Sequence, residues 1–391
     1  MGRQPAEAWF PRQLTRRTRT IACGLFVLRL WCAWWLLAAE GGGAGTVSAA
    51  DGPTADDVAN AAPLGSFAWV TDMHLDGSRL EYTAEAFRQL RTEWKPHFVL
   101  ITGDNNAHPA APGETTPADP PGLGGLISDP AAHRHLPALR MADEPESLGF
   151  RRQRFLRAFL DEHLQLPYAI IPGDNWPQDF DLVFGPKQYS FDWCGLHFLL
   201  LAPDRSLHGA KLEGLSAFDE PTRDWIERDL DRNRRRPTIV AIHEPIYPPT
   251  FLDARPLQRI IARRPNVIAV LQGHLHRDLQ YRLNGTTYLV GPSLGMPPTQ
   301  AMKLVRVYAD RLVLQTAAYR RGNGRFELVD RRQTIEIAEP LRSELAAPAG
   351  ASFAMTNYDA LPARPLVQDP QLPLRIGELL QNAAGFVLRA E

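Results

Sequence analysis

The chain has 391 residues, of which 44% are hydrophobic and 22% are charged. This composition is that of a folded globular protein, and it excludes disordered, collagen-like and coiled-coil chains. Because 43 Lys and Arg stand against 44 Asp and Glu, the chain lacks the basic excess of a nucleic-acid-binding protein, and no specific nucleic-acid binding is expected.

Residues 1–50 differ in composition from the rest of the chain. Five Arg precede residue 20, residues 21–39 are apolar apart from Arg29, and residues 41–50 are mostly small. This order is typical of a secretory signal peptide that is cleaved near Ala50. We favour cleavage over an N-terminal membrane anchor, because Arg29 interrupts a stretch that barely reaches the about 20 residues of a membrane span. We therefore expect an exported protein, periplasmic or extracellular, or one associated with a membrane through this segment.

From Phe67 onward, short apolar runs alternate with amphipathic stretches, which indicates an α/β fold. Strands are expected at residues 67–70, 98–102, 168–171, 238–242 and 267–271, and helices at 80–94, 150–164, 219–230 and 256–264. Residues 188–192 and 197–202 are expected to pair as a β-hairpin. The strands expected at 286–290, 303–308, 311–316, 325–329 and 334–337 would form a second sheet.

Two stretches depart from this alternation. Residues 105–148 contain eight prolines and no sustained periodicity, which predicts a long loop inserted into a domain that spans residues 62–340. A lid over a site and a solvated insertion explain this loop equally well. Residues 341–391 are rich in Ala and Pro, and we expect a peripheral tail with one helix at 374–387.

Five segments place Asp, Asn or His directly after predicted strands. They are residues 71–74 (TDMH), 102–106 (TGDNN), 172–176 (PGDNW), 242–245 (IHEP) and 273–276 (GHLH). In an α/β fold these positions lie at the carboxyl edge of a sheet, where ligands bind. Carboxylate and imidazole groups suit Mn, Fe and Zn, and one carboxylate can bridge two ions. The five segments together therefore predict a site for a pair of metal ions.

In this order, the five segments resemble those of the calcineurin-like metallophosphoesterase superfamily over about residues 65–320. The resemblance implies a metal-dependent phosphoric ester hydrolase with a four-layer α/β/β/α sandwich, in which helices flank two mixed sheets. It also implies the ligands of two ions, which would be Mn, Fe or Zn. Asp72, His74 and His276 would bind one ion, His243 and His274 the other, and Asp104 would bridge the two.

One segment departs from the pattern of the superfamily. Where the superfamily has Gly-Asn-His, this chain has Gly173-Asp174-Asn175. Asp174 takes the place of a metal-binding Asn and can still coordinate through oxygen, and its negative charge favours harder or more highly charged ions such as Mn or Fe. Asn175 takes the place of a His that stabilises charge or protonates the leaving oxygen. An amide cannot donate a proton at neutral pH.

The resulting hypothesis is an exported phosphoesterase in which a hydroxide that bridges two ions attacks the phosphorus of a small phosphorylated substrate in line. Asp104, Asp174 and Asn175 would be its catalytic residues. Phosphodiesters of acidic alcohols and phosphoanhydrides are slightly favoured over monoesters, because their leaving groups depart without protonation. Alternatively, one of the loop histidines (His108, His133 or His135) replaces the missing His. A competing hypothesis is a non-catalytic metal-binding module derived from the same fold.

Overall fold

The structure is a computed structural model that describes residues 62–75, 79–106, 148–174, 179–203, 216–297, 300–348 and 354–356. The described residues belong to one compact unit, Ala61–Gly385. Several predictions lie outside them: the N-terminal signal segment, most of the 105–148 loop with its three histidines, Asn175, and the helix expected at 374–387.

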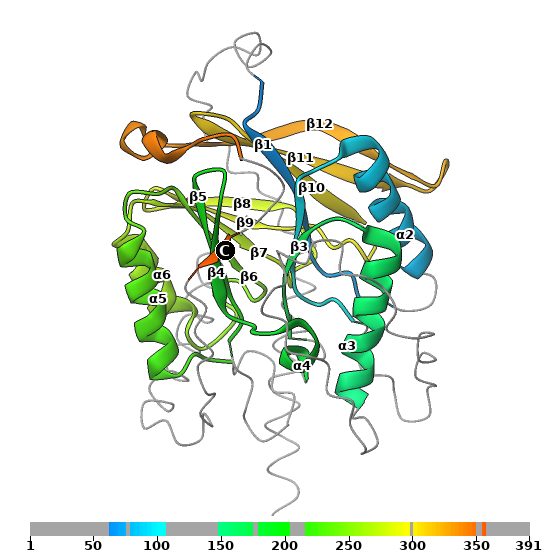
Figure 1. The fold of residues 1–391 in the computed structure, drawn as a ribbon, viewed down its shortest axis with the longest axis horizontal. Helices are drawn as coiled ribbons and strands as arrows, with labels where there is room; N and C mark the ends of the chain where they lie inside the picture. Colours follow the sequence, from blue (N-terminus) through cyan, green and yellow to red (C-terminus); the bar gives the residue numbers. More distant parts are fainter. Residues whose placement is uncertain are drawn as a thin grey trace, which may run out of the picture. The chain divides into compact units, whose positions relative to one another are not determined.

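Two mixed β-sheets form the centre of this unit (Figure 1). The described strands of the first sheet are, in order, β12 (Arg325–Glu336), β11 (Arg311–Arg320), β10 (Ala301–Val307), β1 (Gly65–Val70), β2 (Phe98–Thr102) and β3 (Tyr168–Ile171). Those of the second are β13 (Ala354–Thr356), β4 (Tyr189–Trp193), β5 (Leu196–Leu201), β6 (Thr238–Ile242), β7 (Val267–Gln272), β9 (Thr286–Val290) and β8 (Leu279–Leu283). Strands β1 to β3 are parallel to one another, and so are β5, β6, β7 and β9.

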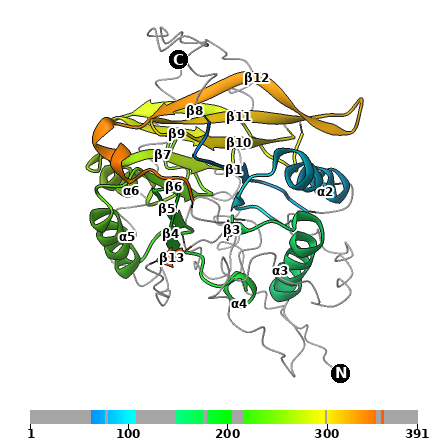
Figure 2. The same cartoon turned by 45° about the horizontal axis from the view of Figure 1, so that its top comes forward.

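Helices cover the outer faces of both sheets, as Figures 1 and 2 show. The helices α2 (Arg79–Gln89) and α3 (Leu148–Phe159) lie on one side, and α5 (Glu220–Arg232) and α6 (Ala254–Ala262) lie on the other. Helices α2 and α3 each run on through a π-helical turn, Leu90–Trp94 and Leu160–Leu164, and two short helices follow at α4 (Phe180–Phe184) and Glu339–Glu344. This arrangement confirms the predicted α/β/β/α sandwich. Among the described residues, no helix combines the length and hydrophobicity that a membrane span requires.

Aromatic side chains dominate the layer between the two sheets. Phe67 and Phe98 of the first sheet stack with ring centroids 5.1 Å apart, and Phe191 and Phe198 of the second stack at 4.8 Å. Phe67 meets Phe198 edge to face at 5.5 Å, which joins the sheets. Burial of each such side chain contributes about 1.5–3 kcal/mol to folding. Two further apolar clusters fill the spaces between the sheets and their helices.

Several local predictions are confirmed. Strands β4 and β5 pair as an antiparallel hairpin in which Phe191 lies opposite Phe198. Helix α5 begins after Asp219, whose side chain accepts a hydrogen bond of 2.9 Å from the backbone N–H of Thr222. An Asp at this position satisfies one of the free N–H groups of the first helical turn.

The expected distribution of the later strands between the sheets is wrong. Strand β9 belongs to the sheet of β4 to β7, whereas β10, β11 and β12 extend the sheet of β1. The two strands expected at 325–329 and 334–337 are one strand, β12. Its pairing with β11 shifts in register between Gln315 and Ala317. Apolar periodicity marks individual strands, but it does not say with which neighbour each strand pairs.

Candidate metal centre

The candidate ligands lie in five connections that follow strands of both sheets. Asp72 and His74 follow β1, Asp104 follows β2, and Asp174 follows β3. His243 follows β6, and His274 and His276 follow β7. The structure brings these seven residues into three overlapping groups whose ligand atoms lie within 4.8 Å of one another. Their side chains are buried or half-buried.

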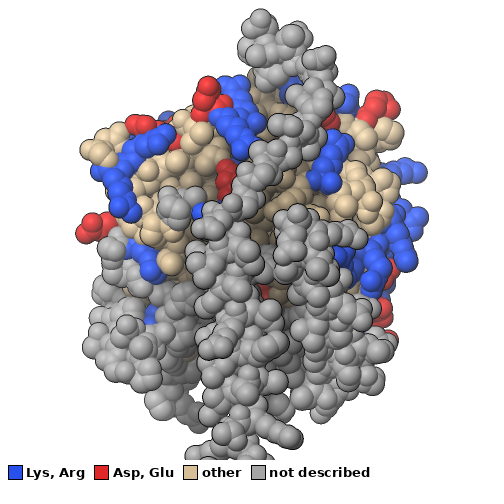
Figure 3. Space-filling model, turned by 180° about the vertical axis from the view of Figure 1, so that it is seen from behind, with Lys and Arg blue, Asp and Glu red and all other residues tan. Residues whose placement is uncertain are grey.

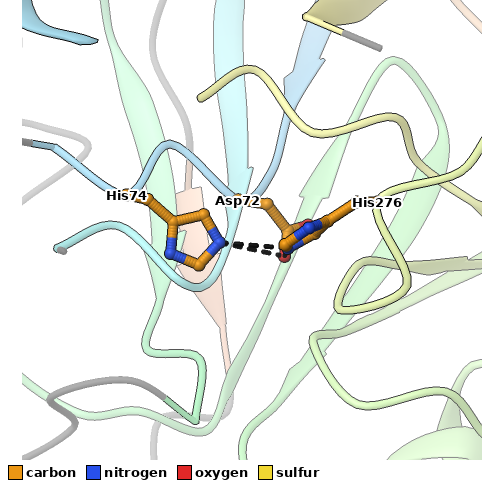
Figure 4. Close-up of side chains that lie close together, drawn as sticks. All are labelled: Asp72, His74 and His276. Atoms are coloured by element: carbon orange, nitrogen blue, oxygen red, sulfur yellow. Dashed lines mark hydrogen bonds and ion pairs between the residues drawn. The ribbon is translucent and has the colours of Figure 1, made fainter. Parts of the chain in front are cut away.

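The first group consists of Asp72, His74 and His276 (Figure 4). The Nε2 atoms of His74 and His276 lie 3.0 Å apart. Asp72 Oδ1 lies 3.1 Å from His276 Nε2 and 3.8 Å from His74 Nε2. Two imidazole nitrogens and one carboxylate oxygen thus face a common point, which suits a transition-metal ion.

The second group consists of Asp174, His243 and His274. Asp174 Oδ1 lies 3.1 Å from His243 Nε2 and 3.2 Å from His274 Nδ1. The carboxylate that replaces the amide of the superfamily therefore faces the same two imidazoles that the sequence assigned to the second ion. Asp174 is buried, so water screens its charge only weakly.

Asp104 lies between the two groups. Its Oδ1 is 3.2 Å from His243 Nε2, and its Oδ2 is 3.8 Å from His74 Nε2. One oxygen thus faces each group. This is the position that the sequence analysis assigned to a carboxylate bridging two ions.

Hydrogen bonds to neighbouring groups fix the orientation of the ligands. His243 Nδ1 lies 2.9 Å from the carbonyl oxygen of Thr102. A carbonyl can only accept, so Nδ1 carries the proton, and Nε2 is the nitrogen presented to the carboxylates. The hydroxyl of Thr71 donates to Asp72 Oδ2 at 2.8 Å, and the backbone N–H of His274 donates to the same carboxylate at 3.1 Å.

Five of the seven candidate ligands have left-handed backbone conformations. They are Asp72, His74, Asp104, His274 and His276, with φ between 45° and 70°. This region costs a non-glycine residue about 1–2 kcal/mol, and such conformations persist only where the surroundings determine them. Backbone hydrogen bonds hold these residues in place: Asp72 N donates to Gly103 O at 3.0 Å, and His74 N donates to Asp104 O at 2.9 Å.

Glycine allows two of the ligand connections to approach each other closely. A Cβ atom on Gly173 would lie 2.1 Å from both the backbone nitrogen and Oδ1 of Asp104. The connections after β2 and β3 could not meet at this distance if residue 173 carried a side chain.

The protonation of the site follows from its dense packing of opposite charges. Burial opposes ionisation of Asp72, but His243, His276 and His74 outweigh it and hold the pKa of Asp72 below its usual value. Burial likewise opposes protonation of His243, yet Asp104 and Asp72 raise its pKa well above the usual value. For His274, Asp174 outweighs burial and raises the pKa to about 9. The site therefore favours positive charge strongly, and a bound cation would take the place of these protons.

The donor set fits a pair of metal ions. Three carboxylates and four imidazoles are arranged as two groups joined by Asp104, and these ligand types suit Mn, Fe and Zn. Asp72, His74 and His276 would hold one ion, Asp174, His243 and His274 the other, and Asp104 both.

Comparison with known proteins agrees with this geometry. A family model described as calcineurin-like phosphoesterase matches residues 65–278. The chain belongs to the calcineurin-like phosphoesterase family. It is therefore a metal-dependent phosphoric ester hydrolase, of a family that uses two metal ions.

Among solved structures of low sequence identity, a dimetal phosphatase shares the fold of this phosphoesterase, and two others are similar to it at lower TM-scores. A dimetal phosphatase from Danio rerio is 13% identical, with a TM-score of 0.50, over 71% of this chain and 100% of its own. GAP50, described as the anchor in the inner membrane complex of Plasmodium, is 15% identical over 76% of this chain and 99% of its own, with a TM-score of 0.41. A predicted phosphoesterase from Streptococcus pneumoniae is 11% identical over 70% of this chain and 98% of its own, with a TM-score of 0.33. No curated protein sequence matches the chain.

Residues 291–297 hold the Asp72 connection, although no sequence motif singled them out. The backbone N–H of Gly295 donates to Asp72 O at 2.9 Å, and the Ser293 hydroxyl donates to the same oxygen at 2.7 Å. The Tyr82 hydroxyl of α2 donates to Gly295 O at 2.6 Å. A Gly- and Pro-rich stretch directly after a predicted strand was the available signal, since such stretches mark turns and close backbone approaches.

Proposed function

We propose that this phosphoesterase is an exported enzyme that hydrolyses a small phosphorylated substrate and slightly prefers diesters or anhydrides to monoesters. The preference rests mainly on Asp174, which lies within 3.2 Å of His243 Nε2 and His274 Nδ1 where the superfamily has a neutral amide. The next residue, Asn175, replaces a potential proton donor.

Bound metal ions supply two things to this chemistry: they activate a water molecule and stabilise the charge that develops on the phosphoryl oxygens. The residues of the chain hold and orient these ions. The Thr102 carbonyl keeps His243 Nε2 turned toward Asp104 and Asp174. Asp104 fixes the two groups relative to each other, because one oxygen faces each.

The charge of the site supports the preference for diesters. A phosphate monoester carries up to two negative charges near neutral pH, whereas a diester carries one. Asp174 adds one negative charge to the ligand set, which lowers the attraction for a dianion more than for a monoanion. Without a proton donor at position 175, substrates with acidic leaving groups lose least, since general-acid help is typically worth about 10²- to 10⁴-fold.

The proposal extends to location and partners. The Arg-rich start and apolar run of residues 1–39 support export, with association through this segment if it is not cleaved. Mass spectrometry of the protein recovered from a secreting host tests this, and a chain that retains residue 1 and stays in the cytoplasm would contradict it. Specific nucleic-acid binding is not proposed, because 43 Lys and Arg stand against 44 Asp and Glu. Figure 3 shows that acidic side chains stand among the basic ones on the described part of one face.

The first experiment compares the wild-type protein with Asp104→Ala by elemental analysis and by hydrolysis of bis(p-nitrophenyl) phosphate and p-nitrophenyl phosphate. We expect two ions per chain and a higher kcat/KM for the diester in the wild type. Substitution of a residue that supports a metal ligand typically lowers activity about 10- to 100-fold. Asp104 is expected to be a ligand itself, so its loss should lower turnover further.

Asp161→Ala is the matched control, because Asp161 lies in the Leu160–Leu164 turn, away from the ligand groups. It should keep both ions and the wild-type rate. Retention of most of the activity in Asp104→Ala would contradict the assignment of Asp104. Two bound ions without hydrolysis of either substrate would favour the non-catalytic metal-binding module.

A further inference from the structure

A buried lysine joins the two sheets beside the connection that carries His274 and His276. Lys303 lies on β10 opposite Trp69 of β1 and Thr316 of β11, and its side chain is 2% exposed. Its Nζ donates to both oxygens of Asp278, at 2.7 and 2.6 Å. Lys303 belongs to the first sheet, whereas Asp278 immediately precedes β8 of the second.

The polar groups around this ion pair satisfy one another. Lys303 Nζ also donates to Thr316 Oγ1 at 2.8 Å and to Gln333 Oε1 at 2.7 Å. The Thr316 hydroxyl in turn donates to Asp278 Oδ2 at 2.7 Å. The ammonium group thus donates its three protons to three side chains, those of Asp278, Thr316 and Gln333. Side chains of β10 and β11 both donate to the Asp278 carboxylate. The Asp278 side chain is 32% exposed, so Lys303 is the buried member of the pair, and a buried charge is tolerated when it is paired and its hydrogen bonds are satisfied in this way.

Asp278 is two residues beyond His276, in the connection from β7 to β8. His274 and His276 both have left-handed backbones, with φ of 70° and 51°, so this connection is unfavourable without outside support. Its start is held where Gly273 N donates to His243 O at 2.9 Å. Its end is held by the Asp278 carboxylate, which Lys303 fixes to the first sheet.

We infer that Lys303 and Asp278 are positioning residues of the metal centre, which hold the His274–His276 connection in the geometry that binds both ions. This inference rests on the proposed metal centre. Neither residue belongs to the ligand groups of the metal centre. Burying the Lys303 ammonium group removes it from water, and ion pairs with a buried member can often be replaced by apolar residues without loss of stability. The pair is therefore better explained by the geometry that it fixes than by the stability that it adds.

The test is the double variant Lys303→Met/Asp278→Leu, which replaces the pair by apolar side chains of similar size. The full chain is stripped with a chelator and titrated with Mn²⁺, followed by electron paramagnetic resonance, and its thermal unfolding is recorded. We expect cooperative unfolding near the wild-type temperature but about 10- to 100-fold weaker Mn²⁺ binding, with the ion of the His276 group lost first. A merely structural role would change the unfolding temperature and leave Mn²⁺ affinity unchanged.

The matched control is Arg311→Met/Asp310→Leu. The two side chains of this ion pair lie 2.8 Å apart. The pair follows the C-terminal end of β10, which lies opposite Gly65. Gly65 is at the start of β1, and the metal-binding residues follow the other end of that strand. It should keep the wild-type Mn²⁺ affinity.

Wild-type Mn²⁺ affinity in Lys303→Met/Asp278→Leu would overturn the inference. If that variant does not fold, Thr316→Val removes one hydrogen bond to Asp278 without leaving an unpaired charge, and unchanged Mn²⁺ binding in it would overturn the inference equally. If the wild type itself binds no Mn²⁺, Fe or Zn, the metal centre is wrong and the inference falls with it. The wild-type titration therefore separates the two failures.

Discussion

The substitution Asp174→Asn tests the feature that distinguishes this metal centre from the pattern of its superfamily. It removes one negative charge, keeps the size of the side chain, and leaves a carbonyl oxygen that can still coordinate. Asp174 Oδ1 lies 3.1 Å from His243 Nε2 and 3.2 Å from His274 Nδ1, in a buried position. The change therefore alters the charge at the second group and little else.

The expected magnitude follows from the separation of the groups. Two unit charges about 4 Å apart interact by about 4 kcal/mol at an effective dielectric constant of 20. The ligand atoms of Asp174, His243 and His274 lie within 4.8 Å of one another, so Asp174 should favour a trivalent over a divalent ion by an energy of this order. Since each 1.4 kcal/mol is tenfold in affinity, Asp174→Asn should reduce the preference for Fe³⁺ over Mn²⁺ by about 10²- to 10³-fold.

The assay is competitive loading of the metal-free protein with Fe³⁺ and Mn²⁺, followed by elemental analysis. The ratio of kcat/KM for bis(p-nitrophenyl) phosphate to that for p-nitrophenyl phosphate is measured on the Mn²⁺-loaded protein, and it should shift toward the monoester. Asp161→Asn, which neutralises a buried carboxylate elsewhere, controls for loss of charge as such. Identical metal selectivity in the wild type and Asp174→Asn would refute the reasoning.

Two further predictions concern the scaffold. His197→Gln should lower the free energy of unfolding by about 3–5 kcal/mol, because Asp192 and Asp229, at 2.6 and 2.7 Å, lose a buried cationic partner. Burial opposes protonation of His197, but these two carboxylates outweigh it and raise its pKa. That stabilisation is complete below about pH 6.5 and is lost as the pH rises through the raised pKa, so a wild-type advantage in urea unfolding that stays constant into alkaline pH would contradict it. Gly295→Ala should weaken Mn²⁺ binding at least about tenfold, because its Cβ would lie 1.8 Å from Met73 O and displace the Asp72 connection. Mn²⁺ affinity is measured by isothermal titration. Gly322→Ala is the control, because nothing lies within 4 Å of the added Cβ, and equal affinities in the two variants would contradict the prediction.

The sequence alone predicts the location of the candidate site because its residues follow buried strands. Asp72, Asp104 and His243 each stand one or two positions beyond a predicted strand, and parallel strands place such positions at a common edge. The assignment of strands to sheets was not predictable in this way. Strand β10 pairs with β1, more than 200 residues earlier in the chain, and periodicity carries no information about such long-range partners.

The backbone conformations of the ligands could not be predicted from the sequence either. Nothing in the letters of His274 or His276 indicates a positive φ, which non-glycine residues seldom adopt. Hydrogen bonds to residues distant in sequence support these conformations, such as that from the backbone N–H of His274 to the carboxylate of Asp72. Motifs identify the groups that can bind a metal, whereas the contacts that hold them in place become visible only in the folded structure.

These contacts place part of the functional unit beyond the residues that define the family. The family match ends at residue 278, and all seven candidate ligands lie within it. Yet Ser293 and Gly295, which bond the Asp72 carbonyl, and Lys303, which fixes Asp278, lie in the following 25 residues. A site whose ligands are held in unfavourable backbone conformations depends on such supports as much as on the ligands themselves. Differences between members of this family in metal affinity and substrate preference should therefore be sought in the segment from 291 to 303 as well as in the five ligand-bearing connections.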